Sequence, residues 1–452
     1  MFVILNNLYN LMISNKKSQF LFLCFYDNNI YLCCECCKLC CLICKKPKIP
    51  EMSNLTNDNK DTNNDNNDQN NDDKDPNTDE EDIIYNSKID SNKKLFENRE
   101  ERCIMDFTIL DNDKIAICYK GGIFNIYKFT YNDNKFLSKN IIHIEDDEYC
   151  FNKVIKLNDN KIALVSEDGT FKIYKIEFNS NTYQPLQKII HNQKDPIYTI
   201  LELKNGDLVF GCHKEIIIYN LNNDNYEEKK RYFFNTYCFS ILEIEPNIIS
   251  ITNCDTKKLF IIDLNKCNDK NININELKTE EEFNNKGITK IDNIKSGEYS
   301  ENQIYLKDKS LLFICSGEND SKGGINIIDI KNNKLLKYID LDYSLTSLCV
   351  INKYNKDNNT FEILGGSRKR IYCEKVNFKY DIIQFEFDLK DINNINFKVT
   401  SQLERVHYYE ITKIQNSLYS KIDNNLIFNK NSKNQIIFSI GSEDKLIKIF
   451  KV

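Results

Sequence analysis

Cysteine is the most concentrated reactive side chain in this 452-residue chain. Eight of its eighteen cysteines lie between Cys24 and Cys44. A thiolate can bind a soft metal ion, and a thiol near a membrane can carry a lipid, so such a cluster invites both interpretations. The candidate residues are Cys33, Cys34, Cys36, Cys37, Cys40, Cys41 and Cys44.

Three kinds of chemistry compete for this cluster. Four of the cysteines have the C-x2-C-x2-C-x3-C spacing of an iron–sulfur loop, but Lys45 replaces the usual proline and no second motif follows. Zinc would need two cysteine pairs set further apart. S-acylation beside Lys45, Lys46 and Lys48 would anchor the chain by lipid and charge. The remaining alternative is that the cluster does no chemistry, including the case in which translation begins at Met52. We therefore expect no metal or other cofactor.

A basic run forms the second candidate site. Arg368, Lys369 and Arg370 follow Gly365-Gly366-Ser367 directly. Guanidinium and ammonium groups bind carboxylates and phosphates, so the run predicts contact with an acidic peptide or a phosphoinositide headgroup. The alternative is a solvated turn in a lysine-rich protein.

Catalytic residue sets are missing from the sequence pattern. The chain has four histidines, His143, His191, His213 and His407. None forms a metal-ligand pair at helical spacing, and no glycine-rich phosphate loop follows a strand and opens a helix. We therefore expect a protein that is not an enzyme.

Charge divides the chain into three segments. Residues 53–82 hold nine Asp, two Glu and two Lys, a net charge of −9, whereas residues 1–52 carry +3. Because the total is −6, residues 83–452 are neutral and lack the basic surface of a general nucleic-acid binder. We expect a Cys-rich segment at 1–50, a disordered acidic Asn/Asp-rich linker at 51–82 and a folded domain at 83–452.

The other ten cysteines are scattered singly, several of them inside apolar runs. Such thiols behave as small buried hydrophobes in a reducing compartment. The longest apolar run near the start, residues 20–26, is far shorter than the roughly 20 residues of a membrane span. No signal-peptide cleavage site follows it. These features favour a cytoplasmic protein, with peripheral membrane attachment as the alternative.

Two stretches of the folded segment repeat one another without a gap. Residues 107–129 and 154–176 align at an offset of 47, and weaker copies follow to the end of the chain. Each copy consists of three expected strands separated by turn residues such as Gly121-Gly122. The residues that end the third strand recur seven times, as Tyr127, Tyr174, Tyr219, Ile262, Ile328, Phe385 and Phe450. A repeat of this length built from strands predicts seven small sheets in a ring.

The ends of two copies resemble the end of a WD repeat. They are residues 166–174, SEDGTFKIY, and residues 441–450, GSEDKLIKIF. Tyr or Phe takes the position of the family's Trp, and the family's Gly-His is absent. The resemblance implies an all-β, seven-bladed β-propeller with four antiparallel strands in each blade. It also implies that residues 82–90 or 93–96 supply the outer strand of the last blade.

The resemblance implies a kind of function as well. Propellers expose rigid loop faces, so we expect a non-catalytic scaffold or adaptor that binds proteins or peptides through these faces. It would act as a monomeric propeller within a complex. The basic run and His213 would lie in turns on the usual partner-binding face. The alternative is a membrane-associated adaptor that uses acylated N-terminal cysteines or the basic run as a phosphoinositide site.

The later copies depart from the repeat. Insertions are expected at residues 295–309, 368–380 and 419–434, and a short helix at 276–283. We therefore expect the distinctive binding surface on blades five to seven. The strand-end aromatic residues are expected to pack between neighbouring blades. Asp168 and Asp444 are expected to form turns by bonding their own backbone.

Overall fold

The computed structural model describes the chain in two units, Met1–Glu81 and Asp82–Val452. The described residues are 22–26, 29–33, 94–100, 102–110, 113–132, 135–145, 149–190, 195–222, 225–253, 258–295, 302–319, 322–372, 376–407, 411–422, 425–428, 434–441 and 445–451. In the first unit, β1 (Phe22–Tyr26) and β2 (Asn29–Cys33) form an antiparallel hairpin. All other described elements belong to the second unit.

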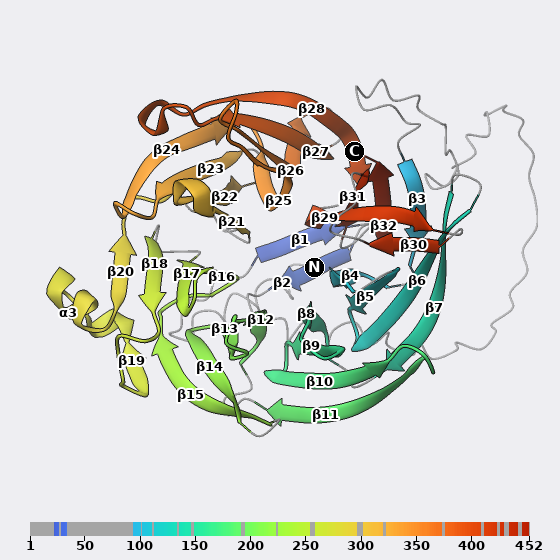
Figure 1. Cartoon of the computed structure of the whole chain (residues 1–452), viewed down its shortest axis with the longest axis horizontal. Helices are drawn as coiled ribbons and strands as arrows, with labels where there is room; N and C mark the ends of the chain where they lie inside the picture. The colour runs from blue at the N-terminus through green and yellow to red at the C-terminus, as the bar shows by residue number, and fades with distance from the viewer. Residues whose placement is uncertain are drawn as a thin grey trace, which may run out of the picture. The chain divides into compact units, whose positions relative to one another are not determined.

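The second unit is a seven-bladed β-propeller of four-stranded antiparallel sheets, as predicted (Figure 1). Blade 1 consists of β4 (Ile104–Ile109), β5 (Lys114–Tyr119), β6 (Ile123–Asn132) and β7 (Lys135–Glu145). Blade 2 consists of β8 (Phe151–Lys156), β9 (Lys161–Ser166), β10 (Thr170–Glu177) and β11 (Thr182–Ile190). Blade 3 consists of β12 (Ile197–Glu202), β13 (Leu208–Cys212), β14 (Glu215–Asn222) and β15 (Asn225–Phe233). Blade 4 consists of β16 (Ser240–Glu245), β17 (Ile248–Asn253), β18 (Lys258–Asp263) and β20 (Ile288–Ile291).

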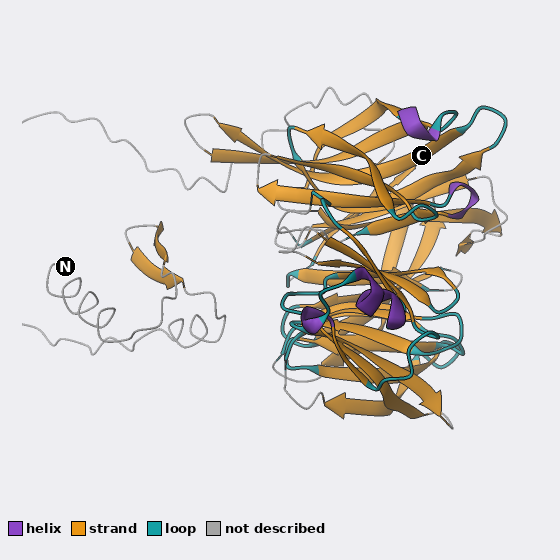
Figure 2. Ribbon diagram, turned by 90° about the vertical axis from the view of Figure 1, so that its left-hand side faces the viewer, coloured by secondary structure: helices purple, strands orange, loops and turns teal. Residues whose placement is uncertain are grey.

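The remaining blades follow the same order from the inside outward. Blade 5 consists of β21 (Gln303–Leu306), β22 (Leu311–Asn319), β23 (Lys322–Asp329) and β24 (Lys334–Leu341). Blade 6 consists of β25 (Ser344–Asn355), β26 (Thr360–Tyr372), β27 (Val376–Asp388) and β28 (Asn396–His407). Blade 7 is β29 (Ile411–Ile422), β31 (Asn434–Gly441), β32 (Leu446–Lys451) and β3 (Lys94–Arg99). Two short 3-10 helices, η3 (Lys307–Lys309) and η4 (Ile392–Asn394), lie in connections of blades 5 and 6. Seen edge-on, the strands cross from one loop-bearing face to the other (Figure 2).

The ring closes through its inner strands and through β3. Each blade's first strand contacts the first strand of the next blade, and β29 of blade 7 contacts β4 of blade 1. Strand β3 pairs antiparallel with β32, which confirms the prediction that residues 93–96 help to close the last blade. The Lys448 ammonium lies 2.9 Å from the Glu97 carboxylate across this pair. The other predicted closing segment, 82–90, lies outside the described residues.

The core consists of apolar layers between neighbouring blades. One layer joins Phe171 of blade 2 to Phe210 and Tyr219 of blade 3, and comparable layers lie at other blade junctions. Tyr127, Tyr174 and Tyr219 are each at least nine-tenths buried in such layers. This confirms that the strand-end aromatic residues of the first three copies pack between blades, where alternate residues of a strand face the same neighbour.

An ion pair between a partly buried lysine and a buried carboxylate adds a polar link between the innermost strands. The Lys413 ammonium of β29 lies 2.8 Å from the Asp106 carboxylate of β4. Asp106 also accepts a hydrogen bond from the backbone N–H of Val154 on β8, at 3.0 Å. Burial lowers the pKa of Lys413, and Asp106 acts in the opposite direction. The pair therefore connects blades 7, 1 and 2 at the centre of the ring.

The predicted insertion at residues 295–309 is partly wrong. Strand β21 lies inside it and forms the innermost strand of blade 5, whereas β20 pairs with β18 as the outer strand of blade 4. The sequence pattern did not separate these roles, because an outer and an inner strand show the same short apolar alternation. Between β18 and β20 the chain adds β19 (Asn271–Asn273), which pairs parallel with β15 of blade 3.

The short helix expected at 276–283 is present with shifted bounds. It forms as η2 (Ile274–Glu276) and α3 (Glu280–Asn285), and α3 lies at the outer rim (Figure 1). Thr279 caps α3 by accepting a hydrogen bond from the Glu282 N–H, and Glu282 bonds back to the Thr279 N–H. This reciprocal capping box explains why the helix begins at Glu280. Phe283 is its buried residue.

The other two expected insertions extend strands instead of separating them. Strands β26 and β27 continue as one hairpin, in which Lys369 pairs with Lys379 and Tyr372 with Val376. The prediction of a loop at Arg368 is therefore wrong, because β-branched and aromatic residues on both sides favour paired strands. Similarly, β29 runs on to Ile422 and pairs with β30 (Asn425–Phe428) within the expected insertion at 419–434.

Candidate protein-interaction site

The second-to-third strand turn of blade 3 and the loop from blade 3 to blade 4 meet on one face of the propeller. In antiparallel blades this face carries every turn after a second strand and every loop after a fourth strand. His213 and Lys214 form the turn between β13 and β14, and residues 234–239 form the loop between β15 and β16. Backbone hydrogen bonds from Cys238 N–H to Cys212 O and from Phe234 N–H to Lys214 O join the two.

Alternation along the loop sorts its side chains between core and surface. Phe234, Thr236 and Cys238 are buried at 3%, 3% and 0% exposure. Tyr237 and Phe239, at the intervening positions, stay partly exposed. This period of two is that of extended backbone, which places alternate side chains on opposite sides. The loop is therefore anchored by its even-numbered residues and presents two rings to solvent.

Gly211 allows the loop to lie close to β13. A Cβ atom at this position would be 2.4 Å from the Cys238 carbonyl oxygen and 2.6 Å from the Thr199 side chain. Any other residue would push the loop away from the strand. The close approach holds the loop backbone, and hence Tyr237 and Phe239, in one position.

Four rings form a compact cluster on this face, named here the aromatic patch: Tyr198, His213, Tyr237 and Phe239. His213 stacks on Tyr237 with ring centroids 4.3 Å apart and planes 18° apart. Tyr237 and Phe239 are parallel within 2° at 5.6 Å. Tyr198, the second residue of β12, meets both of these rings edge-on, at 5.6 and 4.8 Å. All four rings are partly exposed.

The patch is electrically neutral near physiological pH. Burial lowers the pKa of His213 below its ordinary value, and the neighbouring Lys214 lowers it further, while Asp195 acts in the opposite direction. A neutral imidazole is thus the form that stacks on Tyr237. Rigid, partly exposed aromatic rings give large contact area at low entropic cost, which is the chemistry of interface hot spots.

The candidate residues predicted from the sequence do not join this patch. Cys33 ends β2, and Cys34, Cys36, Cys37, Cys40, Cys41 and Cys44 lie outside the described residues. Arg368, Lys369 and Arg370 lie in β26, where Arg368 pairs with Ser344 of β25. The basic run therefore belongs to an extended hairpin of blade 6, on the face that also carries the turns after the other second strands.

The histidines separate in the structure. His213 occupies the turn predicted for it and contributes to the patch. On β7, His143 Nδ1 lies 2.7 Å from the side-chain oxygen of Asn125. His407 ends β28, and His191 lies outside the described residues. Within the described part of the chain, no group of three His, Cys, Asp or Glu side chains is placed to hold a metal ion.

Asp168 acts locally, as predicted. Its carboxylate accepts hydrogen bonds from the Thr170 N–H at 3.0 Å and from the Thr170 hydroxyl at 2.7 Å, and it also contacts the Ser166 hydroxyl. This network closes the turn between β9 and β10, where Gly169 has a φ of 76°. Asp444, for which the same role is predicted, lies outside the described residues.

The sequence reasoning missed the aromatic patch itself. Aromatic residues were interpreted as strand-end packing, whereas Tyr237 and Phe239 lie on a loop between two blades. One signal could have identified them, because residues 232–240, YFFNTYCFS, hold five aromatic residues in nine positions.

The described residues also contain no helix that is long and apolar enough to cross a membrane.

Comparison with solved structures identifies proteins of the same architecture. The WD40 β-propeller domain of Doa1 is 12% identical, covers 79% of this chain and 96% of its own length, and has a TM-score of 0.50. A chain of the mitotic checkpoint complex is 11% identical, with 80% and 96% covered and a TM-score of 0.53. Sqt1 from Chaetomium thermophilum, solved bound to the N-terminus of ribosomal protein L10, is 12% identical, with 77% and 84% covered and a TM-score of 0.52.

No family model and no curated protein matches the sequence. At such low identity the solved structures establish the fold alone, a β-propeller like the one described above. The chain therefore has the fold of the WD40 β-propellers, as the two repeat ends indicate.

Proposed function

We propose that this protein is a non-catalytic interaction scaffold that holds a peptide segment of a partner protein on the aromatic patch. The observation that carries the proposal is the stack of His213, Tyr237 and Phe239, which is partly exposed on a loop anchored by buried neighbours. Partner binding would cover these rings without rearranging the loop, so little conformational entropy would be lost.

The solved structures of similar fold support this kind of function. Sqt1 was solved with the N-terminus of ribosomal protein L10, and another neighbour is part of the mitotic checkpoint complex. Each of these two chains was therefore solved in an assembly with another protein or peptide. We propose the same kind of role here, for a monomeric propeller that acts within a cytoplasmic complex and spans residues 83–452.

The basic run remains a second contact that we propose for an acidic partner segment. Pairing places Lys369 directly opposite Lys379 in the β26–β27 hairpin. The run thus places three cationic residues in succession on β26, and guanidinium and ammonium groups bind carboxylates. A membrane-associated role through acylated cysteines or a phosphoinositide site stays a prediction, and none of the structures named above supports it.

Affinity capture with mass spectrometry tests the proposal. Tagged full-length protein and the double variant Tyr237→Ala, Phe239→Ala are expressed in the source cells and captured in parallel. The expected result is a set of proteins that the unchanged chain retains and the variant loses. The same capture with a chain lacking residues 1–82 should retain this set, because the patch lies within the propeller.

A matched control removes two other exposed rings. Tyr183 on β11 and Phe397 on β28 are 44% and 36% exposed, and both lie on outer strands. The variant Tyr183→Ala, Phe397→Ala should capture the same proteins as the unchanged chain. Identical captures from the patch variant and the unchanged chain would show that the patch is not the binding site.

A further inference from the structure

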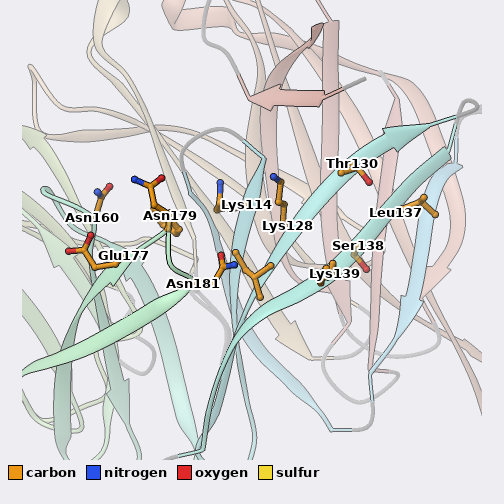
Figure 3. Close-up of a pocket in the computed structure, with 12 residues that line it drawn as sticks. Lys114, Lys128, Thr130, Leu137, Ser138, Lys139, Asn160, Glu177, Asn179 and Asn181 are labelled. Atoms are coloured by element: carbon orange, nitrogen blue, oxygen red, sulfur yellow. The ribbon is translucent and has the colours of Figure 1, made fainter. Parts of the chain in front are cut away.

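A groove between blades 1 and 2 opens on the face opposite the aromatic patch. It is bordered by the turns between first and second strands and between third and fourth strands, including those around Asn160 and Asn179 (Figure 3). Its volume is about 890 Å³. This lies within the range of about 300–1,000 Å³ that is usual for small-molecule sites.

Lysines dominate the charge of this groove. Lys114, Lys128 and Lys139 line it, and Glu177 is the acidic residue of the lining (Figure 3). Asp113 holds two of the ammonium groups next to each other, with Lys114 at 2.6 Å and Lys128 at 3.4 Å from its oxygens. The Asp113 side chain is only 10% exposed, so it holds the Lys114 and Lys128 ammonium groups from the buried side of the groove.

The charges around the groove do not balance. Glu177 pairs with Lys175 at 3.4 Å, outside the lining. Counting the two ion-pair partners outside the lining, Asp113 and Lys175, the region holds four lysines and two carboxylates, an excess of two positive charges. Lys139 is exposed on β7 and pairs directly with Lys128 of β6, so a third lysine lies beside the two held by Asp113. An anion with two or more negative charges would complement this surface.

Neutral hydrogen-bond donors and apolar groups complete the lining. The Thr130 and Ser138 hydroxyls and three asparagine amides border the groove. Two of these asparagines, Asn160 and Asn181, have φ angles of 57° and 53°, a left-handed conformation that asparagine tolerates in tight turns. Leu137, 55% exposed, and Phe178 supply apolar surface. The Lys114 ammonium lies 5.1 Å from the centre of the Phe178 ring.

Comparison of the repeats of blades 1 and 2 shows that a blade can form without the unbalanced lysines of the groove. At the offset of 47, Lys128 corresponds to Lys175 and Thr130 to Glu177. Blade 2 therefore pairs its lysine with its own glutamate on the same strand, at 3.4 Å. Blade 1 has threonine at that position, and Lys128 turns to the Asp113 already shared with Lys114. The positive groove arises where the two copies differ.

We propose that this groove binds a small organic phosphate, with the lysines and hydroxyls on the phosphate groups and Leu137 and Phe178 against the organic part. Lysine binds phosphate as a point charge, and several ammonium groups around one anion act together. The site is independent of the proposed scaffold function, because it lies on the opposite face and shares no residue with the aromatic patch.

Titration calorimetry on the full chain tests the charged part, with pyrophosphate as the probe. The variant Lys128→Gln, Lys139→Glu should bind pyrophosphate at least about tenfold more weakly. The matched control is Lys307→Gln, Lys356→Glu, since these lysines are 70% and 76% exposed in first-to-second strand turns of the same face. The control should stay within about twofold. Equal weakening in both variants, or no saturable binding to the unchanged chain below about 5 mM, would overturn the proposal.

Two further measurements keep the test decisive. Thermal unfolding should give the same midpoint for the single variant Lys139→Glu and the unchanged chain, because Lys139 is exposed, and this variant alone should still weaken pyrophosphate binding. Adenosine diphosphate tests the organic part, since it carries the same diphosphate group. It should bind more tightly than pyrophosphate, and Leu137→Ser should remove much of that difference. Equal affinity for the two probes, unchanged by Leu137→Ser, would show that only bare phosphate binds.

Discussion

Two clusters of aromatic rings lie around blade 3 and use the same residue types for different purposes. Phe171, Phe210 and Tyr219 pack between blades 2 and 3 with ring centroids 4.5–5.3 Å apart, and all are at least nine-tenths buried. Tyr198, Tyr237 and Phe239 of the aromatic patch have similar centroid distances, 4.8–5.6 Å, but remain partly exposed.

The difference lies in which element carries the rings. The buried cluster comes from second and third strands, whose side chains face the neighbouring blade. The patch comes from a loop between blades and from the start of an inner strand, where no further blade covers the outward side chains. The distances between rings therefore do not distinguish a core cluster from a candidate binding surface. The position of the rings on the blade does distinguish them.

The largest effect is expected from the buried cluster. Phe210→Ala removes a ring that is 1% exposed and leaves a cavity between two blades. The free energy of unfolding should fall by about 3–5 kcal/mol, as is usual for buried phenylalanine. Urea denaturation followed by circular dichroism measures this change. A loss below about 1 kcal/mol would mean that the two clusters do not differ in their structural role.

The next largest effect concerns binding and not stability. Tyr237→Ala should weaken a partner bound at the patch by about 2 kcal/mol or more, roughly thirtyfold. The same variant should lower the free energy of unfolding by less than about 1 kcal/mol, because the ring is already partly exposed. Surface plasmon resonance with a partner identified by capture gives the first number, and urea denaturation gives the second. If Tyr237 had only a structural role, Tyr237→Ala would lower the free energy of unfolding strongly and leave partner binding nearly unchanged.

Gly211→Ala probes how strongly the patch depends on the core beneath it. The added Cβ would collide with the Cys238 carbonyl and displace the loop that carries Tyr237 and Phe239. We expect the free energy of unfolding to fall by about 1–3 kcal/mol, together with weaker partner binding. If stability falls while binding is unchanged, the patch does not need a fixed loop.

The smallest effect is the titration of His213. Because burial and Lys214 lower its folded pKa, the folded chain resists protonation more than the unfolded chain, in which histidine titrates near 6.5. The contribution of neutral His213 to the free energy of unfolding is therefore complete above about pH 6.5. It is lost as the pH falls through the folded pKa of His213. NMR titration of the His213 ring should show a lowered pKa that rises in Tyr237→Ala. An unchanged pKa in that variant would show that Tyr237 does not shield the imidazole.

Much of the fold was predictable, and the errors have a common cause. The repeat at 107–129 and 154–176 led to seven blades, and the WD-like ends led to four strands in each. The errors concern strand pairing. Strand β21 lies inside an expected insertion and is the inner strand of blade 5, β20 is the outer strand of blade 4, and the run at Arg368 is part of a strand. A short apolar segment shows that it is a strand, but it does not show with which strand it pairs.

The candidate sites were less predictable than the fold. Blades five to seven were favoured as the binding region because their copies are the most altered. The aromatic patch and the lysine groove that we propose as sites lie on blades 1–4. At the groove, the copies that form blades 1 and 2 differ at single positions such as Thr130 and Glu177. Such differences have meaning only once the neighbouring side chains are known.

The sequence by itself determined most of the strands and turns and the number of blades, because alternation and turn residues act over a few neighbouring positions. Only the tertiary structure decided that β3 closes the ring and that Tyr198, His213 and Tyr237 meet on one face. The same holds for Lys114 and Lys128, which Asp113 draws together. These contacts join side chains from different strands, turns and loops, and their distances depend on strand pairing and blade packing, which no local pattern encodes.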